Sequence, residues 1–253
     1  MILDSFRLDG KVAIVTGSAR GLGQGIAVAL AEAGADIVGV RNSGPTETQA
    51  QVERLGRRFL DMHADLSSIE PVSGIVEKAV AAFGHVDILV NDAGIIRRQD
   101  SIDFTVKDWD DVMNVNVRTL FFLSQAVARK FLAQGRGGKI INIESLLSFQ
   151  GGIRIPSYTA SKSAVMGLTK LLANEWATFG INVNGIAPGY MVTDNTAALR
   201  ADPERSKSIL ERIPAGRWGT PGDLQGAAVF LASQASDYVN GYTLAVDGGW
   251  LAR

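Results

Sequence analysis

A tyrosine and a lysine four residues apart, Tyr158 and Lys162 in "RIPSYTASK", have side chains suited to proton transfer. This spacing places both side chains on one face of a helix. A phenol ordinarily loses its proton near pH ~10, so base chemistry near neutrality needs a neighbouring positive charge, which Lys162 would supply. Ser145 directly follows the stretch "KIINIE", and its hydroxyl could hydrogen-bond the substrate oxygen from which Tyr158 removes a proton. The three residues predict removal of a hydroxyl proton as a hydride leaves, or the reverse on a ketone; a packing aromatic and a solvated lysine are the structural alternatives.

A glycine-rich stretch, "TGSARGLGQG", follows the first predicted strand and indicates a nucleotide-binding loop. Gly17, Gly21 and Gly23 are spaced G-x-x-x-G-x-G. Glycine lets the backbone turn tightly and approach a pyrophosphate at a helix N-terminus. The spacing differs from G-x-G-x-x-G and could be simple loop geometry, but its place between a strand and a helix favours a dinucleotide.

The residue at the end of the second predicted strand bears on the choice between NAD and NADP. An acidic residue there would bind the adenosine ribose of NAD, but "DIVGVRN" ends in Arg41. A guanidinium would attract a 2′-phosphate, and Arg20 could add a second positive charge. We therefore expect NADP, with two solvated arginines as the alternative. Asp65, in "HADLS", could accept a hydrogen bond from the adenine amino group or cap a helix.

Short apolar runs rich in β-branched residues alternate with longer helical patterns along the whole chain. This alternation predicts an α/β fold with a doubly wound parallel sheet of about seven strands, helices on both faces, and one domain over residues 1–253. Ligands of such sheets bind beyond the carboxyl ends of the strands. The predicted strands are 11–16, 36–40, 57–62, 87–91, 139–143, 182–187 and 243–246, and the helices 21–33, 46–55, 71–83, 107–134, 158–179, 202–211 and 222–233.

The composition excludes several classes of function. Hydrophobic residues make up 46% and charged residues 20%, with a net charge of -1, so we expect neither a nucleic-acid nor a membrane partner. The chain has no cysteine and two histidines, His63 and His85, on different predicted elements, so we expect no metal site. The start "MILDSFRLDG" does not read as a signal peptide, and we expect a cytoplasmic protein.

Six motifs in order, "TGSARGLG", "NDAG", "NVN", Ser145, "YTASK" and "APG", resemble those of the short-chain dehydrogenase/reductase family over nearly the whole chain. The resemblance implies a Rossmann-type fold, a nicotinamide cofactor, a homotetramer and a catalytic tetrad of Asn116, Ser145, Tyr158 and Lys162. The lysine would also hold the nicotinamide ribose. The predicted cofactor-binding residues are Gly17, Arg20, Gly21, Leu22, Gly23, Arg41, Asp65, Leu66, Asn91, Ala93, Gly94, Tyr158, Lys162, Pro188, Gly189 and Thr193.

A narrower set of stretches, including "SFQGGIRIPSYTASK", "IAPGYMVTDNT" and the C-terminal "SDYVNGYTLAVDGGWLAR", resembles the sugar-acid dehydrogenases of this family. The resemblance implies oxidation or reduction of a secondary alcohol or ketone of a 2-deoxy- or 3-deoxy-hexonate, with gluconate as the alternative substrate. Such enzymes are often NAD-linked, which opposes the expectation from Arg41. A catalytically silent cofactor sensor is the alternative from another class.

Two acidic residues depart from the family pattern at strand ends near the expected cofactor. Asp92 stands where a second asparagine is usual, and Glu144 precedes Ser145 where a small neutral residue is common. Each carboxyl must be paired, solvated or protonated. We expect Glu144 to point away from Ser145 if the strand alternation continues to its end.

A sugar-acid pocket should offer the substrate carboxylate a cation. We expect Arg154 in that role, with Arg97 or Arg98 as alternatives, and Gln150 and Tyr190 near the substrate hydroxyls; solvated loop arginines are the alternative. The polar segment at about 190–217 would form a lid over the substrate or an ordinary surface helix pair.

Overall fold

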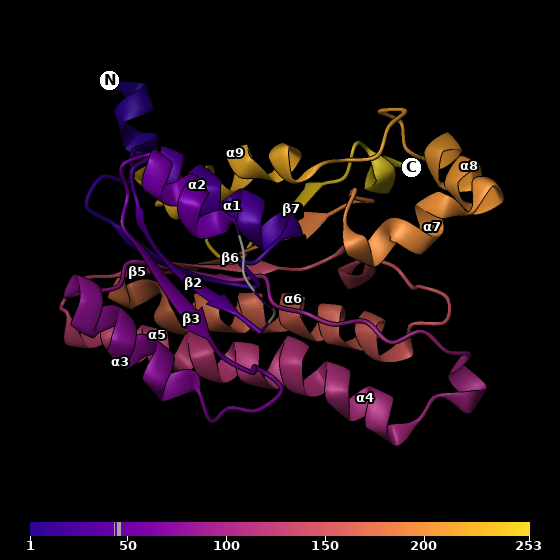
Figure 1. Cartoon of the computed structure of the whole chain (residues 1–253), viewed down its shortest axis with the longest axis horizontal. Helices are drawn as coiled ribbons and strands as arrows, with labels where there is room; N and C mark the ends of the chain where they lie inside the picture. Colours follow the sequence, from indigo (N-terminus) through magenta and orange to yellow (C-terminus); the bar gives the residue numbers. More distant parts are fainter. Residues whose placement is uncertain (43, 45–46) are drawn as a thin grey trace.

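The computed structural model describes residues 1–42, 44 and 47–253, which form one parallel sheet between two layers of helices (Figure 1). The sheet has seven strands in the order β3-β2-β1-β4-β5-β6-β7. This is the predicted Rossmann-type doubly wound fold. The strands are β1 Val12–Thr16, β2 Asp36–Arg41, β3 Phe59–His63, β4 Ile88–Asn91, β5 Gly138–Ile143, β6 Ile181–Pro188 and β7 Thr243–Val246.

The central strands form because their apolar residues lose water on both faces of the sheet. All five residues of β1 and all four of β4 are buried. Their side chains alternate between two clusters of buried apolar residues, one on each face: Ile14 and Leu89 join one cluster, Ala13 and Ile88 the other. A continuous apolar run in this sequence therefore marks a strand that is buried on both faces of the sheet.

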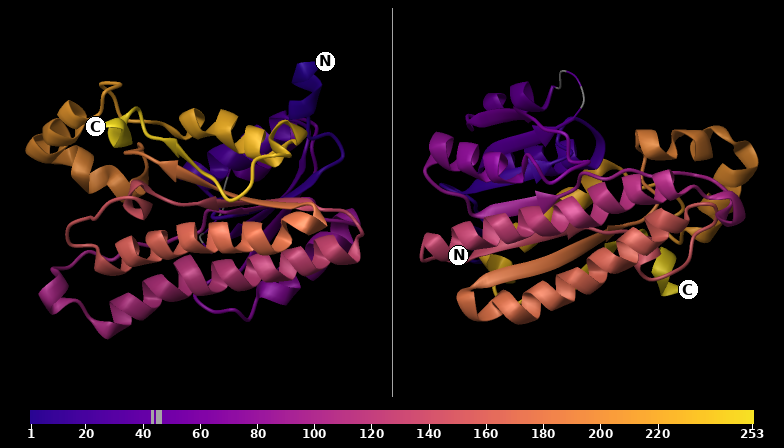
Figure 2. Two further views of the ribbon diagram at one scale, coloured as in Figure 1. Left: turned by 180° about the vertical axis from the view of Figure 1, so that it is seen from behind. Right: turned by 90° about the horizontal axis from the view of Figure 1, so that it is seen from below.

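The helices divide between the two faces of the sheet (Figures 1 and 2). One layer holds α3, α4, α5 and α6, and the other holds α1, α2 and α9. Two short helices, α7 and α8, stand beyond the sheet near the C-terminus. The bounds are α1 Gly21–Glu32, α2 Thr48–Arg54, α3 Val72–Phe83, α4 Val106–Met113, α5 Leu120–Ala133, α6 Pro156–Trp176, α7 Ala197–Ala201, α8 Pro203–Arg212 and α9 Pro221–Ala232.

Most element predictions agree with the structure to within two residues, and the differences have local causes. The helix expected at 107–134 is α4 and α5 joined by a π-helical turn, Asn114–Thr119. The helix expected from 158 begins at Pro156, because proline is well tolerated in the first helical turn. Residue 46 of the helix expected at 46–55 lies outside the described residues. The short helix α7 was not predicted.

The connections between strands lead away from β1 in opposite directions at the carboxyl end of the sheet. The chain leaves β1 for β2 on one side, whereas β4 pairs with the other side of β1. Helices therefore diverge above this point, where doubly wound folds bind their ligands.

The C-terminal segment packs within its own chain. Trp250 is buried in a cluster with Leu146, Ile209 and Ile213, and it lies 4.7 Å from the ring of Tyr190 between centroids. The aromatic tail is thus covered by α8 and by the segment after β5. Within the described ranges, no helix is long and apolar enough to cross a membrane.

Candidate active site

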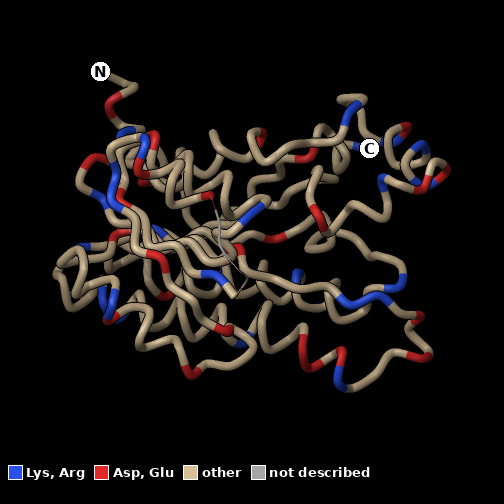
Figure 3. The backbone as a smooth tube through the Cα atoms, viewed as in Figure 1, with Lys and Arg blue, Asp and Glu red and all other residues tan. Residues whose placement is uncertain are grey.

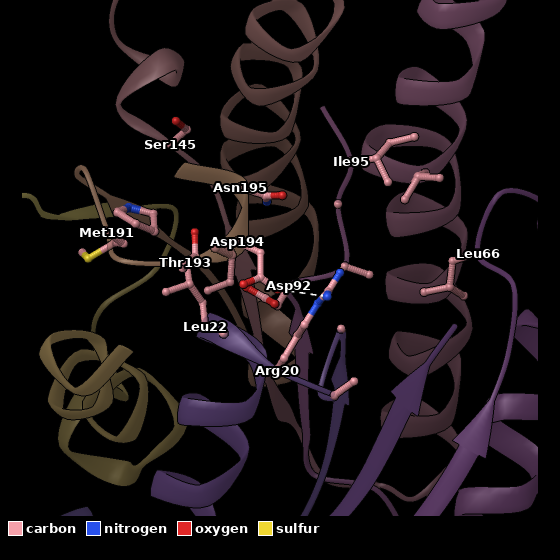
Figure 4. Close-up of a pocket in the computed structure, with 18 of the residues that line it drawn as sticks. Arg20, Leu22, Leu66, Asp92, Ile95, Ser145, Met191, Thr193, Asp194 and Asn195 are labelled. Carbon is pink, nitrogen blue, oxygen red and sulfur yellow. Dashed lines mark ion pairs between the residues drawn. The ribbon is translucent and has the colours of Figure 1, made fainter. Parts of the chain in front are cut away.

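A cleft of about 720 Å³ opens above the carboxyl ends of the strands (Figure 4). This volume lies in the range of small-molecule and cofactor sites. The lining comes from segments that follow β1, β2, β3, β4, β5 and β6. The predicted residues on it are Gly17, Arg20, Gly21, Leu22, Arg41, Asp65, Leu66, Ala93, Gly94, Ser145, Tyr158, Lys162, Pro188, Gly189 and Thr193.

The glycine loop needs its glycines for conformation and for space. Gly17 has φ +71° and Gly21 φ +61°, a region that favours glycine. A Cβ atom on Gly23 would lie 2.4 Å from the carbonyl oxygen of Gly17. These constraints let α1 begin at Gly21 directly behind the loop, with its N-terminus at the cleft. The arrangement fits a phosphate group there.

Arg41 lies at the cleft but already has a carboxylate partner. Its Nε and Nη2 atoms lie 2.7 and 2.5 Å from the two carboxylate oxygens of Asp61 on β3. Its Nη1 donates to the carbonyl oxygen of Gly44 at 3.0 Å. Asp65 accepts hydrogen bonds from the Ser67 N–H and from Asn42. The guanidinium is thus held in place at the end of β2 with part of its charge neutralised.

The proton-handling residues meet at the other end of the cleft. Lys162 Nζ is buried, donates to the carbonyl oxygen of Ile143 at 2.6 Å and lies 5.6 Å from the centroid of the Tyr158 ring. Ser145 directly follows β5, and its hydroxyl accepts from the N–H of Leu147 at 3.2 Å. The end of β5 and the first turns of α6 therefore bring Ser145, Tyr158 and Lys162 to one cleft, as the sequence predicts.

Asn116 lies in the π-helical turn and ties three segments together. Its side chain accepts from the N–H of Ile95 at 2.9 Å and donates to the carbonyl oxygen of Ile95 at 3.0 Å. It also donates to the hydroxyl of Ser161 on α6 at 3.1 Å. Its side chain fixes the segment after "NDAG" against the helix that carries Tyr158, while its neighbour Val115 lines the cleft.

Asp92 follows β4 under the glycine loop. If Gly17 and Gly23 carried Cβ atoms, those atoms would lie 2.9 and 2.6 Å from Oδ2 of Asp92, so the carboxyl group packs closely against the loop. Burial raises the pKa of this carboxyl to about 7, against the opposing effects of the Lys162 charge and a hydrogen bond from the Gly23 N–H. Asp92 therefore changes its charge near neutral pH at the start of α1.

The predicted substrate residues apart from Ser145 lie outside the lining of the cleft in the described part of the chain. Arg97 pairs with Asp108 and Asp111, and Arg154 pairs with Asp100. Gln150 accepts hydrogen bonds from Arg212 and from the indole of Trp250. Tyr190 packs between two tryptophans, Trp218 and Trp250.

Three further predicted residues also lie outside the lining of the cleft in the described part of the chain. Arg98 donates to the carbonyl oxygen of Asn195 at 3.0 Å. Asn91, predicted to bind cofactor, is buried and donates to Ser124 and Asn142 inside the core. Gly23 shapes the loop from beneath and does not line the cleft in the described part of the chain.

A group of cleft residues after β6 was predicted only as part of the lid at about 190–217, and not residue by residue. Asp194 forms an ion pair with Arg20 at 2.9 Å across the cleft (Figure 4). The signal was present in "PGYMVTDNT", which continues directly from the predicted Gly189 and Thr193. The lining residues not predicted individually are Met191, Val192, Asp194, Asn195 and Thr196.

Known proteins are similar in sequence to this chain over its full length. Residues 17–251 match the protein family described as "Enoyl-(Acyl carrier protein) reductase". The chain is 70% identical over 253 residues to 2-dehydro-3-deoxy-D-gluconate 5-dehydrogenase of Dickeya dadantii (strain 3937), covering 100% of both chains.

Two solved structures extend the comparison. One, from Agrobacterium tumefaciens, is described as a candidate 2-deoxy-D-gluconate 3-dehydrogenase with bound NADP; it is 56% identical, has a TM-score of 0.93, and the match covers 98% of this chain and 99% of that one. The other is a gluconate 5-dehydrogenase from Burkholderia cenocepacia J2315 in complex with NADP and tartrate, 44% identical, with a TM-score of 0.94 and 100% coverage of both chains. Taken with the cleft and its residues, these likenesses show that the chain belongs to the short-chain dehydrogenase/reductase family.

Proposed function

We propose that this protein is an NAD(P)-dependent 2-dehydro-3-deoxy-D-gluconate 5-dehydrogenase, which moves a hydride between the cofactor and C5 of the sugar acid. The observation that carries the proposal is the meeting of Ser145, Tyr158 and Lys162 in one cleft with the glycine loop. Full-length identity of 70% to a relative of that name supports the substrate.

The chain's own residues supply the proton chemistry. A bound nicotinamide would accept the hydride in oxidation and donate it in reduction. Tyr158 takes the proton from the substrate hydroxyl, and the Ser145 hydroxyl hydrogen-bonds the same oxygen. Lys162 Nζ is buried and lies 5.6 Å from the centroid of the Tyr158 ring, beside the site of proton transfer. In reduction, Tyr158 returns the proton to the carbonyl oxygen.

The proposal is tested by following reduced-nicotinamide absorbance with both cofactors and a panel of 2-dehydro-3-deoxy-D-gluconate, gluconate, 2-deoxy-gluconate and neutral sugars. We expect the highest kcat/KM with 2-dehydro-3-deoxy-D-gluconate. A higher value with gluconate would favour the gluconate 5-dehydrogenase alternative. Cofactor binding without turnover of any of these compounds would favour a sensor.

We propose that the preferred cofactor is NADP, held at its 2′-phosphate by Arg41. The support is the position of Arg41 on the cleft at the end of β2. Arg41→Ala should weaken NADPH binding about 10- to 100-fold, the effect of losing a charge-assisted hydrogen bond, and change NADH binding much less. Fluorescence titration with both reduced cofactors measures this. Asp61→Asn, which removes the competing carboxylate, should strengthen NADPH binding; an equal loss for both cofactors in Arg41→Ala would contradict the assignment.

We expect cofactor affinity to fall as pH rises through about 7, because Asp92 then becomes negative beside the pyrophosphate. One linked proton changes affinity by at most about tenfold per pH unit. At pH 8, Asp92→Asn should bind NADPH about tenfold more tightly than the parent. At pH 6, the variant and the parent should bind NADPH about equally. Titrations at pH 6, 7 and 8 measure the slope. The exposed Asp110→Asn is the matched control, and an unchanged slope in Asp92→Asn would contradict the linkage.

We propose that the segment at about 190–217 acts as a lid. Asp194, Asn195 and Thr196 already line the cleft, and the Arg20–Asp194 ion pair joins this segment to the glycine loop. Closure would carry the segment over bound substrate and exclude water.

We also propose that the chain forms homotetramers. Large apolar side chains are exposed on α4, α5, α6 and near β7, among them Trp109, Leu132, Leu171 and Tyr242. Light scattering should give about four times the 26.9 kDa chain mass.

Basic and acidic residues are interspersed along the backbone (Figure 3).

A further inference from the structure

The carboxyl group of Glu144 lies inside the protein, and the next residue, Ser145, carries the hydroxyl that would hydrogen-bond the reacting oxygen of the substrate. Glu144 is 2% exposed and directly precedes Ser145. Its backbone N–H donates to the carbonyl oxygen of Ile186 on β6 at 2.7 Å. Its Oε1 lies 2.8 Å from the hydroxyl oxygen of Thr169 on α6. The side chain therefore enters the layer between the sheet and α6, while Ser145 lines the cleft.

A glycine on the neighbouring strand makes room for this side chain. Gly185 lies on β6, and a Cβ atom there would be 2.2 Å from Oε1 of Glu144 and 2.5 Å from its Cδ. Real Cβ atoms do not approach this closely, because packed interiors tolerate no such overlap. Glu144 and Gly185 are thus a matched pair, in which one residue is large because the other is small.

The hydrogen bonds around Thr169 indicate which form of the carboxyl group is present. Thr169 Oγ1 accepts from Asn142 Nδ2 at 3.0 Å and lies 2.9 Å from the carbonyl oxygen of Val165. A hydroxyl has one hydrogen to donate and can accept twice. If that hydrogen goes to Val165, the short contact to Glu144 is filled only when the carboxyl group donates. A neutral acid satisfies all three contacts at once.

The second oxygen of Glu144 points to the same form. Oε2 is buried and makes no well-formed hydrogen bond among the described residues, and the nearby hydroxyl of Thr243 on β7 makes none either. Leaving a charged oxygen unpartnered inside a protein is far more costly than leaving a neutral one. Burial raises the pKa of Glu144, against opposing effects from Thr169, Thr243 and the charges of Lys162 and Lys170. Lys162 directs its Nζ to Ile143 instead.

We propose that Glu144 is held as a neutral carboxylic acid and, seated against Gly185, is a positioning residue that fixes the end of β5, and with it Ser145, against α6. The positioning part rests on the proposed reaction. The neutral form and the pairing with Gly185 do not, because unfolding measurements test them without substrate.

The pairing is tested by a double-mutant cycle on thermal unfolding. Glu144→Ala and Gly185→Ala should each lower Tm by about 5–10 °C, the first by leaving a cavity and the second by the clash with Oε1. Carrying both changes, the protein should unfold at a higher temperature than either single variant, since the new methyl group occupies the vacated space. Additive losses would overturn the pairing.

The neutral form is tested by Glu144→Gln over a range of pH, with the exposed Glu175→Gln as the matched control. The folded parent keeps its proton whereas the unfolded chain loses it above pH ~4.3, so rising pH destabilises the parent and spares the glutamine variant. We expect the Tm of Glu144→Gln to gain at least about 5 °C on the parent between pH 5 and pH 8. A constant difference would show a charged Glu144, and this test stands even if Gly185→Ala does not fold.

The positioning role is tested by kcat and KM with 2-dehydro-3-deoxy-D-gluconate at saturating cofactor, below the Tm of each variant. Glu144→Ala should lower kcat about tenfold or more with little change in KM, because a small displacement of a reacting group is costly. Glu144→Gln should recover most of the loss. A fall in Tm with unchanged kcat would reduce Glu144 to a structural role, and a glutamine variant as slow as the alanine one would contradict the neutral hydrogen-bonding form.

Discussion

Replacing Tyr158 with phenylalanine should lower turnover about 10²- to 10⁴-fold, the usual contribution of a positioned acid or base. The change removes one oxygen atom from a ring that lies 5.6 Å from Lys162 Nζ, so the cleft keeps its shape while the proton acceptor is lost. Cofactor affinity should change much less than turnover, because the glycine loop and Lys162 are unchanged. Steady-state rates and NADPH titration measure the two effects separately.

The matched control for this prediction is Tyr242→Phe. Tyr242 is largely exposed, lies beside β7 and does not line the cleft in the described part of the chain. It should retain the parent rate. Retention of that rate by Tyr158→Phe would remove the tyrosine from the mechanism.

Replacing Asp87 with alanine should lower the free energy of unfolding by about 1–3 kcal/mol, the usual cost of leaving a buried hydrogen-bonding group without its partner. Asp87 is 4% exposed at the amino end of β4. Its carboxylate accepts from the Val12 N–H at 2.9 Å and lies 3.1 Å from Nε2 of His85. Lys11 and Arg136 lie 3.5 and 3.3 Å from its other oxygen. Its loss leaves a buried N–H of β1 unpaired.

The expected loss corresponds to a Tm lower by about 5 °C, measured by calorimetry. Asp87→Asn, which keeps one acceptor oxygen, should lose less, and the exposed Asp103→Ala should lose little. Because Asp87 lies at the opposite end of the strands from the cleft, KM for the cofactor should stay unchanged in Asp87→Ala at 25 °C. An unchanged Tm would contradict the structural role.

The sequence predicted those features that depend on neighbouring residues. Hydrophobic runs located the strands to within two residues, and helical spacing placed Tyr158 and Lys162 together. Because parallel strands end at one edge of the sheet, Ser145 could be assigned to the same cleft. Family resemblance, fold and enzyme class were predicted correctly for this reason: each depends on local patterns and their order.

Contacts between distant segments were not predictable. Arg41 appears free in the sequence, yet its partner Asp61 is 20 residues away on the adjoining strand β3. Glu144 seemed an isolated departure from the family pattern, and only the fold shows that Gly185, far along the chain, accommodates it. Asn91 likewise turned inward because Ser124 and Asn142 lie beside it.

The most direct test of the proposed reaction follows the transferred hydrogen. The protein is supplied with oxidised cofactor and 2-dehydro-3-deoxy-D-gluconate carrying deuterium at C5, and the products are examined by mass spectrometry and NMR. Hydride transfer through the cleft predicts deuterium at C4 of the reduced nicotinamide, a 5-keto sugar acid, and transfer about 10²- to 10⁴-fold slower with Tyr158→Phe. Oxidation at another carbon, or deuterium released to water, would contradict it.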